Sequence, residues 1–287
     1  MKGTLPTGLP KVDDPTVHKD LVGISSKYIS KNLLKPNVTG LPFSDPKQFV
    51  IFGNSHIYYN NSVHNHLKFI IWSWLEKPRT WINHPNNIFD QPVEEYYVRA
   101  NFFNQKPITI FGDITDRCKS SFWHSHIPID VALFACTHLY NIPTMSVISE
   151  HIEWYKKSFQ ICRNFNIFPS IMIPTEHKAN GEYKEGDIEY LNNLYTEIAN
   201  ECNGLPVPVG LAFNNYRKKY DTDILLNDWD YIHPSKYGTL LTSYTLFATY
   251  FKKNPVGINY RYNWNISDED LQRIQEIAWS TVNDYFG

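Results

Sequence analysis

Two kinds of apolar pattern alternate along the chain. Short apolar runs rich in Val, Ile, Leu and Phe predict buried strands at residues 48–53, 107–113, 127–136, 167–174 and 205–213. Longer segments with apolar residues at helical spacing predict helices at 57–75, 146–165, 187–202, 235–251 and 267–286. Strands that alternate with helices predict a parallel sheet with helices on both faces. We therefore expect a three-layer α/β/α sandwich around a mainly parallel five-stranded sheet.

Small and polar residues gather at the carboxyl ends of the predicted strands. Gly53-Asn54-Ser55 follows the first strand, Gly112 lies at the end of the second, and Thr137-His138 follows the third. In an open parallel sheet, ligands bind outside the carboxyl ends of the strands. The pattern predicts a functional site at this edge.

Two stretches depart from the regular pattern. Residues 1–46 are rich in Pro, Gly and Lys with little periodicity, which predicts an N-terminal extension lying over one domain at 47–287. Residues 77–105 form an aromatic, Asn- and Pro-rich excursion, which is either a wall of a substrate groove or a structural insertion. Its candidates for substrate binding are Trp81, His84 and Tyr97, to which we add Thr137.

Composition narrows the functional classes. The chain has 287 residues and a formal net charge of −2, without the clustered basic surface that nucleic acid requires. No apolar run is long enough to span a bilayer, and the N-terminus lacks the apolar core of a signal peptide. We expect a cytoplasmic chain, or a secreted or periplasmic one if a signal was removed. The aromatic content of 15% suits either carbohydrate faces or core packing.

Metal and cofactor motifs are weak. The four Cys residues form no Cys-x-x-Cys pair, and we expect them to be reduced and mostly buried. The pairs His64/His66 and His124/His126 resemble metal pairs but have no obvious third ligand. No Gly-rich phosphate loop is present. The sequence predicts no metal and no cofactor, and the pattern at 176–177 favours a solvated loop.

Ser55 is the candidate nucleophile. It lies between a buried strand and a predicted helix, where backbone N–H groups and the positive end of the helix dipole would support its chemistry. The competing interpretation is an ordinary turn, because Gly, Asn and Ser are turn formers.

Asp230 and His233 are the candidate partners of that serine. They lie three residues apart, just before the helix predicted at 235–251. An acyl-transfer triad needs an acid that holds the imidazole and an imidazole that takes the serine proton. The alternative is a plain helix start, with Ser235 as its cap. If the triad interpretation is right, Ser55 Oγ lies about 2.6–3.2 Å from His233 Nε2.

Together these blocks resemble the SGNH (GDSL-like) hydrolase superfamily. Gly53-Asn54-Ser55 is similar to its first block, and 230–234, continuing into Ser235–Gly238, is similar to its last block in mostly uncharacterised bacterial branches. The resemblance covers most of residues 48–252 and implies a flavodoxin-like SGNH hydrolase fold. It also implies an oxyanion hole made by Ser55 N–H, Gly112 N–H and an Asn side chain after the third strand. His138 stands where that Asn is expected; Thr137 or Asn141 could take the role, or the hole is incomplete.

The resulting prediction is a serine esterase that cleaves a small acyl group, such as acetyl, from a small-molecule or carbohydrate ester. One alternative is an O-acyltransferase that uses the same triad on a glycan. Another is a catalytically weak glycan-binding module of the same fold. The sequence makes no prediction of the oligomeric state.

Overall fold

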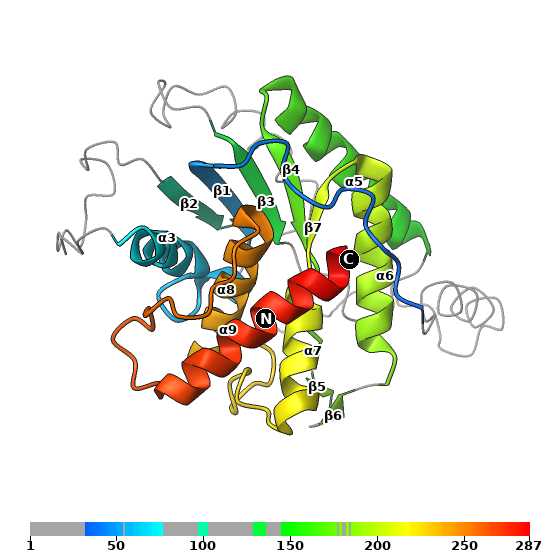
Figure 1. Cartoon of the computed structure of the whole chain (residues 1–287). Helices are drawn as coiled ribbons and strands as arrows, with labels where there is room; N and C mark the ends of the chain where they lie inside the picture. The colour runs from blue at the N-terminus through cyan, green and yellow to red at the C-terminus, as the bar shows by residue number, and fades with distance from the viewer. Residues whose placement is uncertain are drawn as a thin grey trace, which may run out of the picture.

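The computed structural model describes residues 32–53, 55–76, 97–102, 129–135, 145–176, 178–179, 182–183 and 185–287. Its main sheet has five strands, all of whose neighbouring pairs are parallel (Figure 1). The strand order is β2-β1-β3-β4-β7, with bounds Tyr97–Phe102, Gln48–Gly53, Val131–Ala135, Phe168–Met172 and Leu205–Val207. The prediction of a parallel five-stranded sheet is confirmed.

Each central strand is buried on both faces, which explains its continuous apolar sequence. In β1, Phe49 and Ile51 face one core, whereas Val50 and Phe52 face the other. The first core is closed by α3 (Val63–Trp74), α8 (Lys236–Phe251) and α9 (Asp268–Phe286), with most of α7 (Val209–Tyr220). The second is closed by α5 (Met145–Asn164) and α6 (Asp187–Cys202) (Figure 1). These are the three predicted layers.

The strand order places a switch point between β1 and β3. From β1 the chain runs to β2 on one side, and every later strand of this sheet is added on the β3 side, whereas β5 (Lys178–Ala179) and β6 (Glu182–Tyr183) form a separate antiparallel pair. This is the flavodoxin-like order, in which the ligand site lies at the carboxyl ends of the two strands that flank the switch. At that edge Gly53 of β1 pairs with Ala135 of β3.

The strand at 107–113 stays a prediction, and the strand predicted at 205–213 is wrong in its bounds. The second strand is β2 at Tyr97–Phe102, inside the predicted excursion, whereas 107–113 lies outside the described residues. The fifth strand ends at Val207, and most of the remainder of the predicted 205–213 strand belongs to helix α7. A short apolar run fits either element, because Val209, Ala212 and Phe213 also have helical spacing.

The helix predicted at 57–75 is interrupted. A four-residue helix, α2 (Ser55–Tyr58), precedes α3, and between them Asn60, Asn61 and Ser62 have φ angles of 53°, 67° and 66°. Left-handed backbone of this kind cannot continue a right-handed helix, and Asn tolerates it better than most residues. A helix as short as α2 also removes the dipole argument made for Ser55.

The predicted helix starts at Ser235 and Ser267 are confirmed. The hydroxyl of Ser235 accepts hydrogen bonds from the N–H groups of Tyr237 and Gly238, and that of Ser267 accepts from Asp270 N–H. These caps satisfy N–H groups that a helix start leaves without partners.

The part of the N-terminal segment at 32–46 lies along the surface of the domain. Leu34 N–H donates to Asn193 Oδ1 at 2.8 Å, and Asn37 N–H donates to Asn200 Oδ1 at 2.7 Å. Further along, Val38, Leu41 and Phe43 pack against the first core. Residues 1–31 lie outside the described residues, and the division into an extension and a domain stays a prediction. In the described part of the chain, no helix has the length and apolarity needed to cross a membrane.

At Gly210 the start of α7 lies very close to the backbone that follows β4. A Cβ at this position would lie 2.0 Å from the backbone oxygen of Pro174. We expect Gly210→Ala to lower the free energy of unfolding by about 1–3 kcal/mol, because the strain exceeds the gain of up to about 1 kcal/mol in helix propensity. Thermal unfolding measures the change. Gly40→Ala is the matched control, because its Cβ would meet only the end of Lys252 at 3.5 Å. Equal melting temperatures for the two variants would contradict the prediction.

Candidate functional site

The site begins at the carboxyl end of β1, where Ser55 opens α2 two residues after the strand ends. Gly53 permits this sharp change of direction, because a Cβ there would lie 2.6 Å from Ile57 Cγ1. The chain therefore turns tightly onto the end of the sheet and holds Ser55, which is partly exposed, at the switch point.

A chain of hydrogen bonds joins Ser55 to the other predicted residues. His233 Nε2 lies 2.8 Å from Ser55 Oγ, and His233 Nδ1 lies 2.5 Å from Asp230 Oδ2. The first distance falls within the predicted range, although 178 positions of sequence separate the two residues. Their roles in catalysis stay a prediction.

Asp230 is held in its charged form. Its Oδ1 accepts the N–H groups of Ile232 at 2.9 Å and His233 at 3.0 Å. Burial raises the pKa of the Asp230 carboxyl, but the hydrogen bonds from Ile232 and His233 outweigh burial and hold the pKa below its ordinary value. An ionised carboxylate on Nδ1 keeps the proton of a neutral imidazole on that nitrogen and leaves Nε2 free to accept a proton from Ser55.

The loop that carries Asp230 and His233 is a tight turn. Tyr231 has a φ of 54°, and its N–H donates to the Asn227 carbonyl at 2.9 Å. Asn227 N–H in turn donates to the His233 carbonyl at 2.9 Å. A β-bridge between Leu226 and Pro234 closes the base of the turn just before α8. Because its backbone is bonded to itself, the turn presents both side chains in one orientation.

Aromatic rings surround the imidazole, and the sequence reasoning missed them. The ring centroid of Tyr59 lies 4.1 Å from that of His233, with 17° between the planes. Trp229 lies 6.0 Å away at 22°, and 65% of its surface is exposed. The only available signal was proximity, because Tyr59 follows Ser55 by four residues and Trp229 directly precedes Asp230.

Of the other predicted site residues, only Tyr97 lies in the described part of the chain. Those outside it are Trp81, His84, Gly112, Thr137 and His138. Tyr97 stays a predicted substrate-binding residue. It begins β2 and pairs with Gln48, the first residue of β1, so it lies at the amino edge of the sheet, opposite Ser55.

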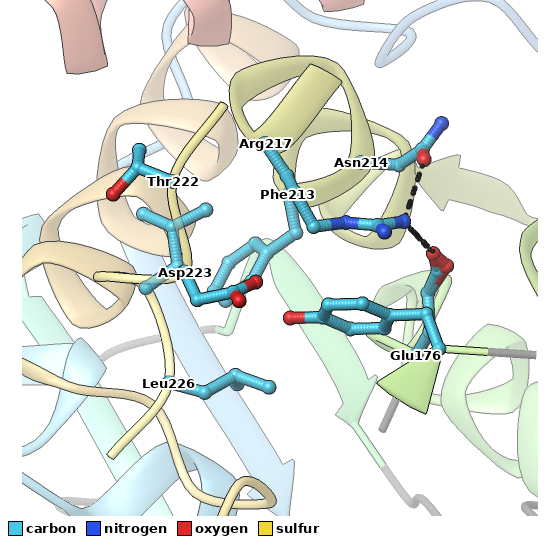
Figure 2. A pocket seen from close by; sticks show the side chains of 9 residues that line it. Glu176, Phe213, Asn214, Arg217, Thr222, Asp223 and Leu226 are labelled. Carbon is cyan, nitrogen blue, oxygen red and sulfur yellow. Dashed lines mark hydrogen bonds and ion pairs between the residues drawn. The ribbon is translucent and has the colours of Figure 1, made fainter. Parts of the chain in front are cut away.

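Glu176 was expected in a solvated loop, and this expectation is wrong. Its carboxylate is buried and forms an ion pair with Arg217, which also donates to Asn214 Oδ1 at 3.0 Å (Figure 2). Burial raises the pKa of Glu176 to about 7, although the Arg217 charge opposes the rise. Figure 2 shows these residues lining a hollow together with Thr222 and Asp223. His177 lies outside the described residues.

Lys178 links this hollow to the Asp230–His233 loop. Its Nζ donates to Asp223 Oδ2 at 2.5 Å and lies 5.0 Å from the ring centroid of Tyr231. Its backbone N–H donates to the Tyr231 carbonyl at 3.4 Å. Lys178 therefore connects the residues of the hollow to the Asp230–His233 loop.

The His64/His66 pair is not arranged around a metal. His66 is fully buried, with Nε2 2.6 Å from the Asn60 carbonyl and Nδ1 2.9 Å from Tyr260 Oη. His64 Nδ1 lies 2.6 Å from Ser62 Oγ. Burial lowers the pKa of both rings to about 4. Within the described ranges, no group of three or more His, Cys, Asp or Glu side chains could hold a metal ion.

Comparison with solved structures identifies the fold. A DUF4886 family protein from Bacteroides uniformis matches with a TM-score of 0.54 and 13% identity, over 85% of this chain and 97% of that protein. A candidate SGNH hydrolase from Slackia heliotrinireducens matches with a TM-score of 0.49 and 12% identity, over 71% and 99% of the two chains. An acetyl xylan esterase from Geobacillus stearothermophilus matches with a TM-score of 0.47 and 12% identity, over 77% and 97%.

Neither a protein-family profile nor a curated protein matches the chain. The predicted α/β fold, a parallel sheet flanked by helices, is confirmed, and the structures that the chain matches include a candidate SGNH hydrolase. At sequence identities of 12–13%, these matches support a similar fold and nothing more. The activity is therefore inferred from the residues of the site.

The raised pKa of Glu176 predicts a pH dependence of stability. The folded state holds this proton up to about pH 7, whereas an unfolded chain releases it near the ordinary value of 4.5. Between these values the folded state binds more protons, so stability falls as pH rises, by up to about 1.4 kcal/mol per pH unit. We expect Glu176→Gln to flatten this slope, measured by urea unfolding from pH 4.5 to 7.5.

Glu182→Gln is the control for that experiment, because Glu182 is exposed and the substitution removes the same kind of carboxylate from the surface. An unchanged slope in Glu176→Gln would show that Arg217 keeps the carboxylate ionised throughout.

Proposed function

We propose that this protein is a serine esterase with Ser55 as nucleophile, His233 as general base and Asp230 as its orienting acid. The observation that carries the proposal is the hydrogen-bonded chain from Ser55 Oγ through both ring nitrogens of His233 to Asp230. The residues lie at the carboxyl edge of a parallel sheet, beside the switch point, where such folds bind their ligands.

The geometry supports acyl transfer in two steps. Ser55 Oγ attacks the ester carbonyl carbon while its proton passes to His233 Nε2 at 2.8 Å. The tetrahedral intermediate expels the alcohol, which takes the proton from His233 and leaves an acyl-Ser55. Water, deprotonated by the same Nε2, then attacks the acyl carbon and releases the acid and Ser55. Asp230 stabilises the imidazolium in both steps.

The proposed oxyanion hole consists of the N–H groups of Ser55 and Gly112 with the side chain of His138. Donors aimed at the developing negative oxygen are usually the largest single contribution to catalysis of this kind. Gly112 and His138 lie outside the described residues, so their part rests on the sequence alone.

The proposed substrate is a small acyl group, such as acetyl, carried on a carbohydrate. Exposed apolar side chains cluster on the loop that holds His233: Trp229, Tyr231 and Ile232 are 65%, 38% and 37% exposed. A flat aromatic surface suits the apolar face of a sugar ring, whose hydroxyl groups can stay hydrated. We infer that Trp229 binds the sugar on the alcohol side of the ester.

The nucleophile is tested with a fluorophosphonate probe. We expect wild type to be labelled at Ser55, as located by peptide mass mapping, and Ser55→Ala not to be labelled. Ser280→Ala, on the terminal helix, is the matched control and keeps its label. Absence of label from wild-type Ser55 would overturn the nucleophile assignment and leave the glycan-binding module as the better hypothesis.

The substrate class is tested with an acetylated sugar and ethyl acetate in parallel. We expect Trp229→Ala to lower kcat/KM for the sugar ester about 3- to 10-fold more than for ethyl acetate, because only the sugar can stack on the ring. Equal losses would remove the sugar subsite from the proposal. Added free sugars distinguish transfer from hydrolysis: consumption of the acceptor faster than release of acetate would favour the acyltransferase.

A further inference from the structure

Among the described residues, His233 has contacts beyond the two that form the triad. Asp230 and Ser55 bond to the ring nitrogens and therefore lie at the edge of the imidazole. The ring of Tyr59 lies against the face, 4.1 Å between centroids and 17° from parallel. We propose that Tyr59 is a positioning residue that stabilises the charged form of His233 through its ring face, an inference that rests on the proposed function.

The neighbouring rings identify Tyr59 as the one that faces the imidazole. The three centroid distances are 4.1 Å for Tyr59–His233, 6.0 Å for Trp229–His233 and 6.2 Å for Tyr59–Trp229. If the imidazole lay between the two rings, the Tyr59–Trp229 distance would be close to the sum of the other two. It is much shorter, so Tyr59 and Trp229 do not lie on opposite faces of the imidazole, and Trp229 lies beside it. Trp229 is thus left available for substrate, while Tyr59 contacts His233.

The turn that carries Tyr59 is anchored independently of Asp230. Asn60 has a left-handed backbone, and its side-chain amide donates to the Pro234 carbonyl at 2.7 Å and to Thr239 Oγ1 at 3.0 Å. These bonds tie the residue after Tyr59 to the residue after His233. The two rings are therefore brought together by their own backbone neighbours.

A buried histidine holds the same turn from the other side. His66 lies 2.6 Å from the Asn60 carbonyl through Nε2 and 2.9 Å from Tyr260 Oη through Nδ1. A carbonyl can only accept, so Nε2 carries the proton, and in the neutral ring Nδ1 accepts from Tyr260. Because burial lowers the pKa of His66 to about 4, this arrangement persists across the neutral pH range.

The stack matters when the imidazole becomes charged. In each step of the proposed reaction, Nε2 receives a proton and His233 becomes a cation. The face of an aromatic ring is electron-rich and attracts a cation within about 6 Å of its centroid. Tyr59 therefore stabilises the imidazolium more than the neutral imidazole, in addition to the carboxylate in the ring plane.

Two other titratable groups lie near the imidazole among the described residues. Among the described residues, Asp230 contacts Nδ1, and the ring of His56 lies 5.2 Å away at 33°. The Tyr59 variants below leave Asp230 and His56 in place, so a change in the titration of His233 reports on the stack.

The first experiment follows the His233 ring proton by NMR as a function of pH, which requires no substrate. We expect Tyr59→Leu to move the midpoint of its titration to lower pH by roughly 0.4 to 1 unit, because the cation loses the aromatic face. Tyr59→Phe keeps the ring and restores the wild-type midpoint. Tyr220→Leu, which removes a ring that packs on Tyr216 and Arg273, is the matched control and leaves the midpoint unchanged.

A kinetic experiment adds the functional consequence. In Tyr59→Leu we expect the acid limb of kcat/KM to move to lower pH by the same amount, and kcat to fall about 3- to 10-fold with KM little changed. If Tyr59→Leu only displaced the imidazole, kcat would fall but the acid limb of kcat/KM would not move to lower pH.

A shape-conserving series covers the case in which Tyr59→Leu does not fold. Phenylalanine with one, two or three ring fluorines at position 59 keeps the ring and progressively withdraws electron density from its face. A stepwise fall of the titration midpoint supports the inference, and equal midpoints along the series overturn it. If wild-type Ser55 is not labelled but the midpoints fall stepwise, the esterase proposal fails and the stack stands.

Discussion

The parallel pairing of β1 between β2 and β3 is the constraint on which the rest of the structure depends. Its alternate residues, such as Ile51 and Phe52, face two separate cores, so this strand contributes to the packing of both layers. Parallel pairing brings the carboxyl ends of all five strands to one edge. The tight turn after Gly53 then places Ser55 at the switch point of that edge.

Irregular backbone completes the site. The turn after α2 and the loop before α8 both use left-handed residues, at Asn60 and at Tyr231, and both are closed by specific hydrogen bonds. Such conformations cost free energy, and the surrounding bonds keep them populated. The two segments also bond to each other through Asn60 and Pro234, so the serine side and the histidine side of the site are joined as one unit.

Polar side chains connect that unit to neighbouring elements of the fold. The Glu176–Arg217 pair and Lys178 connect the end of β4 to α7 and to the Asp230–His233 loop. Gly210 allows the start of α7 to come close enough for this contact. These side chains therefore connect the end of β4 to the loop that carries His233.

The sequence by itself determined the features that depend on local pattern. Continuous apolar runs predicted buried parallel strands, and the caps at Ser235 and Ser267 predicted two helix starts, because burial and capping are decided by neighbouring residues. The candidate residues Ser55, Asp230 and His233 could also be named, since each lies at the boundary of a predicted element.

Only the tertiary structure decided which segments meet. The choice of β2, the edge at which Tyr97 lies, the burial of Glu176 and the stack of Tyr59 on His233 all depend on contacts between distant parts of the chain. An apolar run is compatible with several partners, and a polar side chain with either water or a buried counterion. That choice is made by the packing of the whole chain, which no local pattern contains.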